Sequence, residues 1–404
     1  MAGIFIVIFA IAQIAFAQTS FLPNAKIEKG KMPLVMERAD SLAAMRKAGH
    51  LFLQGNVKFR HDSVEFITER ARWDRTSDAV YSDGGFDFRY PAGNIKADRG
   101  NYSRKSNIAI AEGNAEARDS AGKGTFFGER IIYNRDTEFL EIPNKPLAHY
   151  YLEEKGKLDT LAIRSRVMTY NQKEQIAIAA DSVLITKREV VITGDTGFYN
   201  QKEEFLSLKG NPKCHMSDYT VSGDSMFVKL QNNEVESILV INNAHGTQQT
   251  VAIGKKPGQF SEVFGDTLFL SVKNNKAQNL YVNVNAKGLF YETDLPNFVN
   301  KMNGDRLDIS FNAGRMKLAE VKGNASSLLF NINNNRKIDG KNESSGESIY
   351  ITFDSTQLSK IKVKGNLTSG LASGIYYDMS KMENPAKEEE NGEEYAPSGQ
   401  TPPL

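Results

Sequence analysis

The sequence predicts an all-β fold, a solenoid-like stack of repeated strand–turn–strand units. Three observations predict it: a repeated hairpin pattern, an acidic residue that recurs at a steady spacing, and a Gly-Asn motif in step with it. The repeat is plainest where GDSMFVKLQNNEVESILV, residues 223–240, returns as GDTLFLSVKNNKAQNLYV, residues 265–282. Apolar residues two apart lie on one face of a strand, and Asn-Asn suits a tight turn. Each copy therefore predicts a hairpin with one buried face.

An acidic residue marks each unit along most of the chain. The first four markers are 29 to 31 residues apart, and the last four are 39 to 42 apart. Apolar residues mostly follow two and four positions after each marker, and the residues between them are largely polar. One face of the strands is therefore expected to be buried along the whole chain. Repetition at this period is typical of stacked β folds. The markers are Asp40, Glu69, Asp98, Glu129, Asp195, Asp224, Asp266, Asp305 and Glu347.

A Gly-Asn pair, or a close variant, runs alongside the acidic markers. Its later Asn members are 42, 39 and 42 residues apart, in step with the acidic series. Glycine accepts backbone conformations that other residues avoid, so we expect it to supply a bulge or bend where a strand turns a corner. The pairs begin at Gly55, Gly113, Gly210, Gly323 and Gly365.

Composition narrows the class of protein. The chain has 404 residues, 40% of them hydrophobic and 25% charged, with a formal net charge of +1. These values are ordinary for a folded protein, and the charge predicts no bulk attraction to nucleic acid or to an anionic membrane. The single cysteine, Cys214, excludes an internal disulfide and an all-cysteine metal site.

The first twenty residues predict export. They combine an apolar run with Ala15 and Ala17, a spacing that signal peptidase accepts. We expect cleavage after Ala17, and a signal anchor or a misplaced start site is the alternative, because a charged first region is missing. No later stretch is apolar for long enough to form a membrane helix. The expected segments are a signal peptide at 1–17, a linker at 18–32, short-repeat units at 33–222, long-repeat units at 223–378, either continuous with the first or separate, and a disordered acidic, Pro-rich tail at 379–404.

These repeats resemble the OstA-like (LptA-like, organic solvent tolerance-like) family of periplasmic lipopolysaccharide transport proteins. The resemblance rests on GNV-type strand corners that alternate with ADR..Y or GD.L.L strands, and it covers roughly residues 33–377. It implies an open, twisted β-jellyroll whose apolar groove carries the acyl chains of lipopolysaccharide from the inner to the outer membrane. It also implies a periplasmic location, no enzymatic activity, no cofactor, and partner jellyrolls or further copies of the chain joined by edge-strand pairing.

The inward residues of the repeats are the expected lipid-binding groove. A packed core and an acyl-chain groove leave the same pattern in a sequence, so both interpretations stay open at these positions. Burial of each methylene contributes about 0.8 kcal/mol, so a few acyl chains would suffice for tight capture. The positions are Trp73, Tyr102, Ile131, Tyr133, Met226, Val228, Leu268, Leu270, Leu307 and Ile309.

Catalytic and metal sites are not predicted. The acidic markers occur once per unit rather than in a cluster, which favours turn residues at the start of strands over calcium ligands. The five histidines are scattered, and Cys214 and His215 point to opposite faces of one strand. A structural or adhesive envelope protein with a packed core is the alternative function, and a carbohydrate-active β-solenoid ranks last. Basic residues between Arg70 and Arg135 either meet lipid phosphates or form a solvated face that discourages edge pairing.

Overall fold

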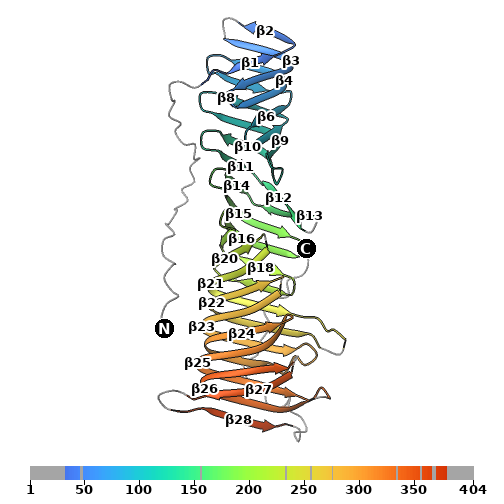
Figure 1. Ribbon diagram of the computed structural model, residues 1–404, viewed down its shortest axis with the longest axis vertical. Helices are drawn as coiled ribbons and strands as arrows, with labels where there is room; N and C mark the ends of the chain where they lie inside the picture. Colours follow the sequence, from blue (N-terminus) through green and yellow to red (C-terminus); the bar gives the residue numbers. More distant parts are fainter. Residues whose placement is uncertain are drawn as a thin grey trace.

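One antiparallel β-sheet of 28 strands makes up the part of the chain that the structure describes. The structure is a computed structural model, and no helix occurs among its described residues, which confirms the predicted all-β class. The strands stack along one long axis (Figure 1). The expected signal peptide, most of the expected linker and nearly all of the expected tail lie outside the described residues. The described residues are 32–45, 49–154, 157–232, 234–254, 257–274, 276–333, 335–354, 357–365 and 370–379.

In the short-repeat part of the chain, pairs of long strands are followed by runs of four shorter strands. A long strand bends once near its middle, and two short strands can take the place of one long strand. The strands are β1 (Val35–Arg38), β2 (Ser41–Met45), β3 (His50–His61), β4 (Val64–Asp74), β5 (Ala79–Ser82), β6 (Phe86–Tyr90), β7 (Gly93–Ala97), β8 (Arg99–Ser103), β9 (Ile108–Asp119), β10 (Gly124–Asn134), β11 (Phe139–Pro143), β12 (Leu147–Glu154), β13 (Lys157–Arg164), β14 (Val167–Asn171), β15 (Ile176–Lys187), β16 (Val190–Asn200), β17 (Phe205–Lys209), β18 (Lys213–Met216) and β19 (Tyr219–Ser222).

The strands lengthen where the repeat period lengthens. Those from β21 to β26 run for 13 to 18 residues each and bend once. The hairpin expected at residues 223–240 is formed by β20 and β21, and the one expected at 265–282 is formed by β22 and β23. The strands are β20 (Ser225–Gln231), β21 (Glu234–Gln249), β22 (Gln259–Lys273), β23 (Lys276–Glu292), β24 (Asn300–Asn312), β25 (Arg315–Ile332), β26 (Ile338–Asp354), β27 (Gln357–Lys364) and β28 (Ser373–Asp378).

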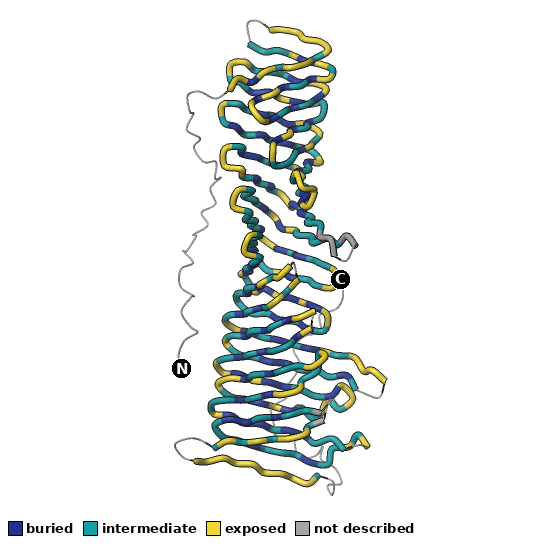
Figure 2. Tube along the Cα trace, in the orientation of Figure 1, coloured by how far each residue is buried: buried dark blue, intermediate teal, exposed yellow. Residues whose placement is uncertain are grey.

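Every level of the stack has two arms that meet at a corner. Strand β4, for example, pairs with β5 along Ala71–Asp74 and with β6 along Glu65–Ile67, so its two halves lie in different arms. Arm A is the column that runs from β2 through β5 to β27, and arm B runs from β1 through β6 to β28. Rings of the two arms touch across the interior, as where Tyr133 of arm A stacks on Tyr90 of arm B at 4.4 Å. The apolar core therefore lies between the arms, along the whole stack (Figure 2).

The two sequence motifs meet in space at the corner. Gly113 has a φ of +77°, in the left-handed region, and a Cβ there would lie 2.7 Å from Oδ2 of Asp98. Glycine is thus required both by the backbone and by the close carboxylate. The strand registers shift at these corners, which confirms the predicted bulges. We expected the acidic markers at turns that start strands. Asp40, Asp98 and Asp224 do lie at a bend directly before a strand, whereas the other markers lie inside long strands, at the corner where the strand continues from one arm into the other.

The sheet runs without interruption across residues 222 and 223, where two domains could meet. Strand β17 pairs with β20, and β19 pairs with β21, so the hydrogen bonding continues in both arms. The buried apolar residues form two clusters that change over earlier, between Ile142 and Ala148. The expected division into domains stays a prediction.

Candidate functional site between the two arms

All ten predicted groove residues lie on the inner face of arm A. The register puts them in two parallel rows, since Met226 pairs with Val240 and Leu268 pairs with Val240 and Val282. Nine of the ten are buried, and the exposed fractions of Met226 and Leu268 are 0%. Trp73 is half-buried and meets Phe59 edge-on at 5.4 Å. The inward orientation inferred from the two-residue spacing is therefore what the structure shows.

The facing wall, on arm B, was missed from the sequence. It contributes buried rings in the first repeats, among them Phe59, Phe66 and Phe88. Tyr102 of arm A lies 5.1 Å from Phe88, ring centre to ring centre, so the two walls are in contact. A signal for this wall exists, because an apolar residue lies three positions before most acidic markers. These residues are Phe66, Ile95, Phe126, Ile192, Val221, Val263 and Met302.

Side-chain contacts hold the arms together on the side opposite the corner, which we call the mouth. Near one end, a ring nitrogen of His61 on arm B lies 2.6 Å from the hydroxyl of Tyr102 on arm A. Near the other end, Nε2 of Gln248 on arm B donates to the carbonyl of Gly314 on arm A at 2.7 Å. The backbone hydrogen bonds of the strands, by contrast, run within each arm.

Burial shifts the pKa values of the two groups that meet at the mouth, His61 and Tyr102. It lowers the pKa of His61, and the nearby cations Arg135 and Arg104 lower it further. Burial also raises the pKa of Tyr102 to about 12, so its hydroxyl keeps its proton at neutral pH. The contact between His61 and Tyr102 is therefore one between neutral groups.

The interior is filled over much of its length. An apolar cavity of about 40 Å³ lies between the arms, lined in part by Val221, Leu268, Met302 and Ile309. About 10–15 Å³ of such space is enough for one water molecule, so this cavity has room for only a few waters. A polar hollow of about 520 Å³ lies at the mouth beside His61. An acyl chain could enter the filled parts only if the arms moved apart.

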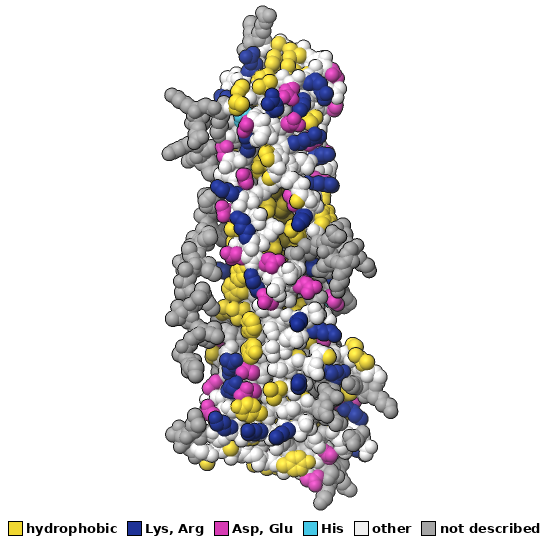
Figure 3. Space-filling model, viewed as in Figure 1, with side chains coloured by type: hydrophobic (Ala, Val, Ile, Leu, Met, Phe, Trp, Pro, Cys, Tyr) yellow, Lys and Arg dark blue, Asp and Glu magenta, His cyan; other side chains and the backbone are white. Residues whose placement is uncertain are grey.

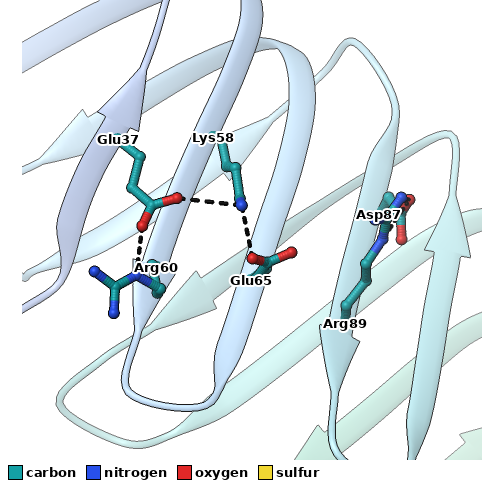
Figure 4. A network of polar contacts seen from close by, with 6 residues as sticks. All are labelled: Glu37, Lys58, Arg60, Glu65, Asp87 and Arg89. Carbon is teal, nitrogen blue, oxygen red and sulfur yellow. Dashed lines mark hydrogen bonds and ion pairs between the residues drawn. The ribbon is translucent and has the colours of Figure 1, made fainter.

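Most of the basic residues near the strand edges have acidic or aromatic partners. Arg99 lies 3.3 Å from Glu112, and the guanidinium of Arg72 lies 4.3 Å from the centre of the Tyr81 ring. The same holds on the outer face of arm B, where Figure 4 shows ion pairs that join β1, β3 and β4. There Lys58 lies 3.2 Å from Glu37 and 2.6 Å from Glu65. These pairs favour a solvated face over a prepared phosphate site.

Metal and covalent chemistry have little support in the described residues. They contain no group of three or more His, Cys, Asp or Glu side chains placed to hold a metal ion. Burial raises the pKa of the Cys214 thiol to about 12, which suppresses the reactive thiolate. Across the described ranges, no helix has the length and hydropathy that crossing a membrane requires.

Comparisons with known proteins add one structural likeness. No protein-family model and no curated protein matches the chain. Among the solved structures that match is the crystal structure of LptH, the LptA-homologous periplasmic component of the lipopolysaccharide transport device of Pseudomonas aeruginosa. The TM-score is 0.26 at 13% sequence identity, over 33% of this chain and 82% of that chain. The family of this chain stays a prediction from its repeats.

Proposed function

We propose that the chain is a periplasmic lipopolysaccharide-binding bridge protein, which holds acyl chains between its two arms. One observation carries the proposal: the apolar interior runs from the first repeat to the last, while the hydrogen bonds that cross the mouth in the described residues involve side chains. Parting the arms at the mouth therefore breaks no strand-to-strand hydrogen bond, because those bonds run within each arm. An acyl chain that replaces contacts between the arms keeps the interior apolar and dry.

The ends of the stack support the bridging part of the proposal. Strand β28 is exposed along its whole length and carries Ile375 and Tyr376, with exposed fractions of 48% and 60%. At the other end, β2 exposes Leu42 and Met45. Such edges accept a strand from a partner jellyroll or from a second copy, which would extend the interior.

A structural or adhesive envelope protein is the second candidate. It is favoured by the tight packing of the interior, where Val228 and Leu268 have exposed fractions of 0%. Such a protein needs no ligand to complete its core, so it should not bind amphiphiles. Binding measurements therefore separate the two candidates.

A competition assay tests the proposal. The purified chain is loaded with a fluorescent fatty acid, and the loss of the bound signal is followed as lipopolysaccharide is added. The matched control is the same lipopolysaccharide with its acyl chains removed by base. We expect the intact lipid to displace the probe and the deacylated lipid to leave it bound. A chain that binds neither probe nor lipid, or that responds equally to both lipids, contradicts the proposal and favours the structural candidate.

A further inference from the structure

Along the inner face of arm A, a row of buried side chains is interrupted by half-buried ones at one level of the stack. The register links one row of residues on the mouth side across successive strands. From Val80 to Leu140 every member is buried, and burial resumes at Leu206 and Val228. Between them, three consecutive members are only half-buried. These are Tyr170, Ala177 and Tyr199.

The facing row of arm B is half-buried at the same level. Its members there are Tyr150, Leu161, Lys187 and Val190, since Lys187 pairs directly with Val190. The two walls are close at this level, because Nε2 of Gln201 on arm A donates to the hydroxyl of Tyr150 at 3.1 Å. We call these seven residues, three on arm A and four on arm B, the side opening. The strands that carry it, from β12 to β16, are mostly half-buried in Figure 2, and Figure 3 shows apolar side chains at the surface around the middle of the molecule.

The facing wall explains why burial is lower here. Ala177 stands directly between Tyr170 and Tyr199 in the register, and Ala179 and Gly197 pair next to it on the corner side. The same arrangement at Tyr102, Ala109 and Tyr133 is buried, because Phe88 and Tyr90 of arm B pack against it. The opening also lies beside the changeover between the two core clusters. It is therefore a level at which arm B covers the inner face of arm A less completely.

We infer that the side opening is where one acyl chain of lipopolysaccharide enters the space between the arms. This rests on the proposed function and gives the site its position. All but one of the lining side chains are uncharged, and the apolar interior continues from them along the stack, so the part of the occupant that lies between the arms is an apolar chain. The exception, Lys187, lies 3.9 Å from Asp159 at the mouth end of β15. Tyr150 and Gln201 place polar atoms at the mouth, where the polar head of an amphiphile stays in contact with water.

Photocrosslinking with the purified full chain and lipopolysaccharide tests this inference. A photoreactive phenylalanine analogue replaces Tyr199 in the side opening, Val228 in the closed part of the same row, or Phe198 on the outer face of the same strand. Thermal unfolding and circular dichroism verify that each variant is folded. We expect adducts at Tyr199 well above those at Val228 and Phe198.

A second variant fills the opening. Ala177→Phe places a ring between Tyr170 and Tyr199, and Ala177→Ser is the small control. We expect Ala177→Phe to lower the adduct yield at Tyr199 about tenfold, because the loss of even two methylene contacts costs a factor of that order. The serine variant should crosslink like the parent.

The outcomes separate the inference from the proposed function. Equal adducts at Tyr199 and Val228 that persist in Ala177→Phe would leave the lipid-binding function standing and overturn the side opening as the place where lipid enters. Adducts as strong at Phe198 would also overturn it, because they report a surface contact. No adducts at any position in folded protein would overturn the inference and the proposed function together.

Discussion

The side-chain amide of Asn114 donates a hydrogen bond of 2.9 Å to Oδ2 of Asp98, sixteen residues earlier in the chain. The same bond joins Asn56 to Asp40, also at 2.9 Å. The acidic marker of one strand and the Gly-Asn pair of the next are thus two parts of one corner. Stacked corners of this kind hold the two arms at the angle that encloses the apolar interior.

The corner predicts an unusual sensitivity to one methyl group. Gly113→Ala should lower the free energy of unfolding by more than the roughly 1–2 kcal/mol that a left-handed backbone costs alanine, because the new Cβ also meets Asp98. The control is Gly122→Ala, at a φ of +69° with no atom near the new Cβ, which should show only the backbone cost. Urea denaturation measures both.

A double variant isolates the steric part of this effect. In an Asp98→Ala background, Gly113→Ala should cost less than in the parent, because only the Cβ of residue 98, at 3.1 Å, stays close to the new methyl group. If Gly113→Ala lowers the free energy of unfolding equally with and without the Asp98 carboxylate, that carboxylate is not the reason why position 113 requires glycine.

Inner and outer residues of one strand should differ sharply in stability. Leu268→Ala deletes a side chain with an exposed fraction of 0% and should cost about 2–5 kcal/mol of unfolding free energy. Thr267→Ala, next to it on the outer face, should change the same quantity by less than about 0.5 kcal/mol. Comparable losses at the two positions, in chemical denaturation, would contradict the assignment of inner and outer faces.

The mouth contact at His61 predicts a loss of stability in acid. The folded-state pKa of His61 is lowered, so the unfolded chain binds the proton more readily than the folded chain. Stability from this group is complete above the ordinary histidine pKa of about 6.5 and is lost as the pH falls below it. His61→Gln should therefore show a smaller drop in melting temperature between pH 7.5 and pH 5.5. His215→Gln, at an exposed position, is the control; an unchanged drop in His61→Gln would contradict the prediction.

The single thiol reports whether the interior is closed. Cys214 has an exposed fraction of 0%, and burial raises its pKa to about 12. We expect a chromogenic disulfide reagent to react with it far more slowly in the native chain than in guanidinium. A native rate equal to the unfolded rate would show that the arms open freely without ligand.

Much of the fold could be predicted because each repeat has a two-residue period on one face. Leu268 and Ile309 are inward because a slip by one residue would expose the whole row to water. The bulge at Gly113 was predictable because few residues other than glycine adopt its backbone. These are local properties, and a sequence records them directly.

The features that could not be predicted from the sequence depend on contacts between residues far apart in the chain. Phe59 of arm B was not assigned to the site, although it packs on Trp73, because the motifs were aligned only after each acidic marker. The side opening was not predicted either. It depends on which residues of arm B face Tyr170, Ala177 and Tyr199, and no local pattern in the sequence specifies that.

Photocrosslinking in living cells tests most directly whether lipopolysaccharide binds between the two arms. A photoreactive residue replaces Leu268 or Ile309 on the inner face, and Thr267 or Arg306 on the outer face. The proposed function predicts lipopolysaccharide adducts from the inner positions alone. No adducts at any of the four positions, in a protein that is folded and exported, would contradict it and leave a structural β-repeat protein with a packed core.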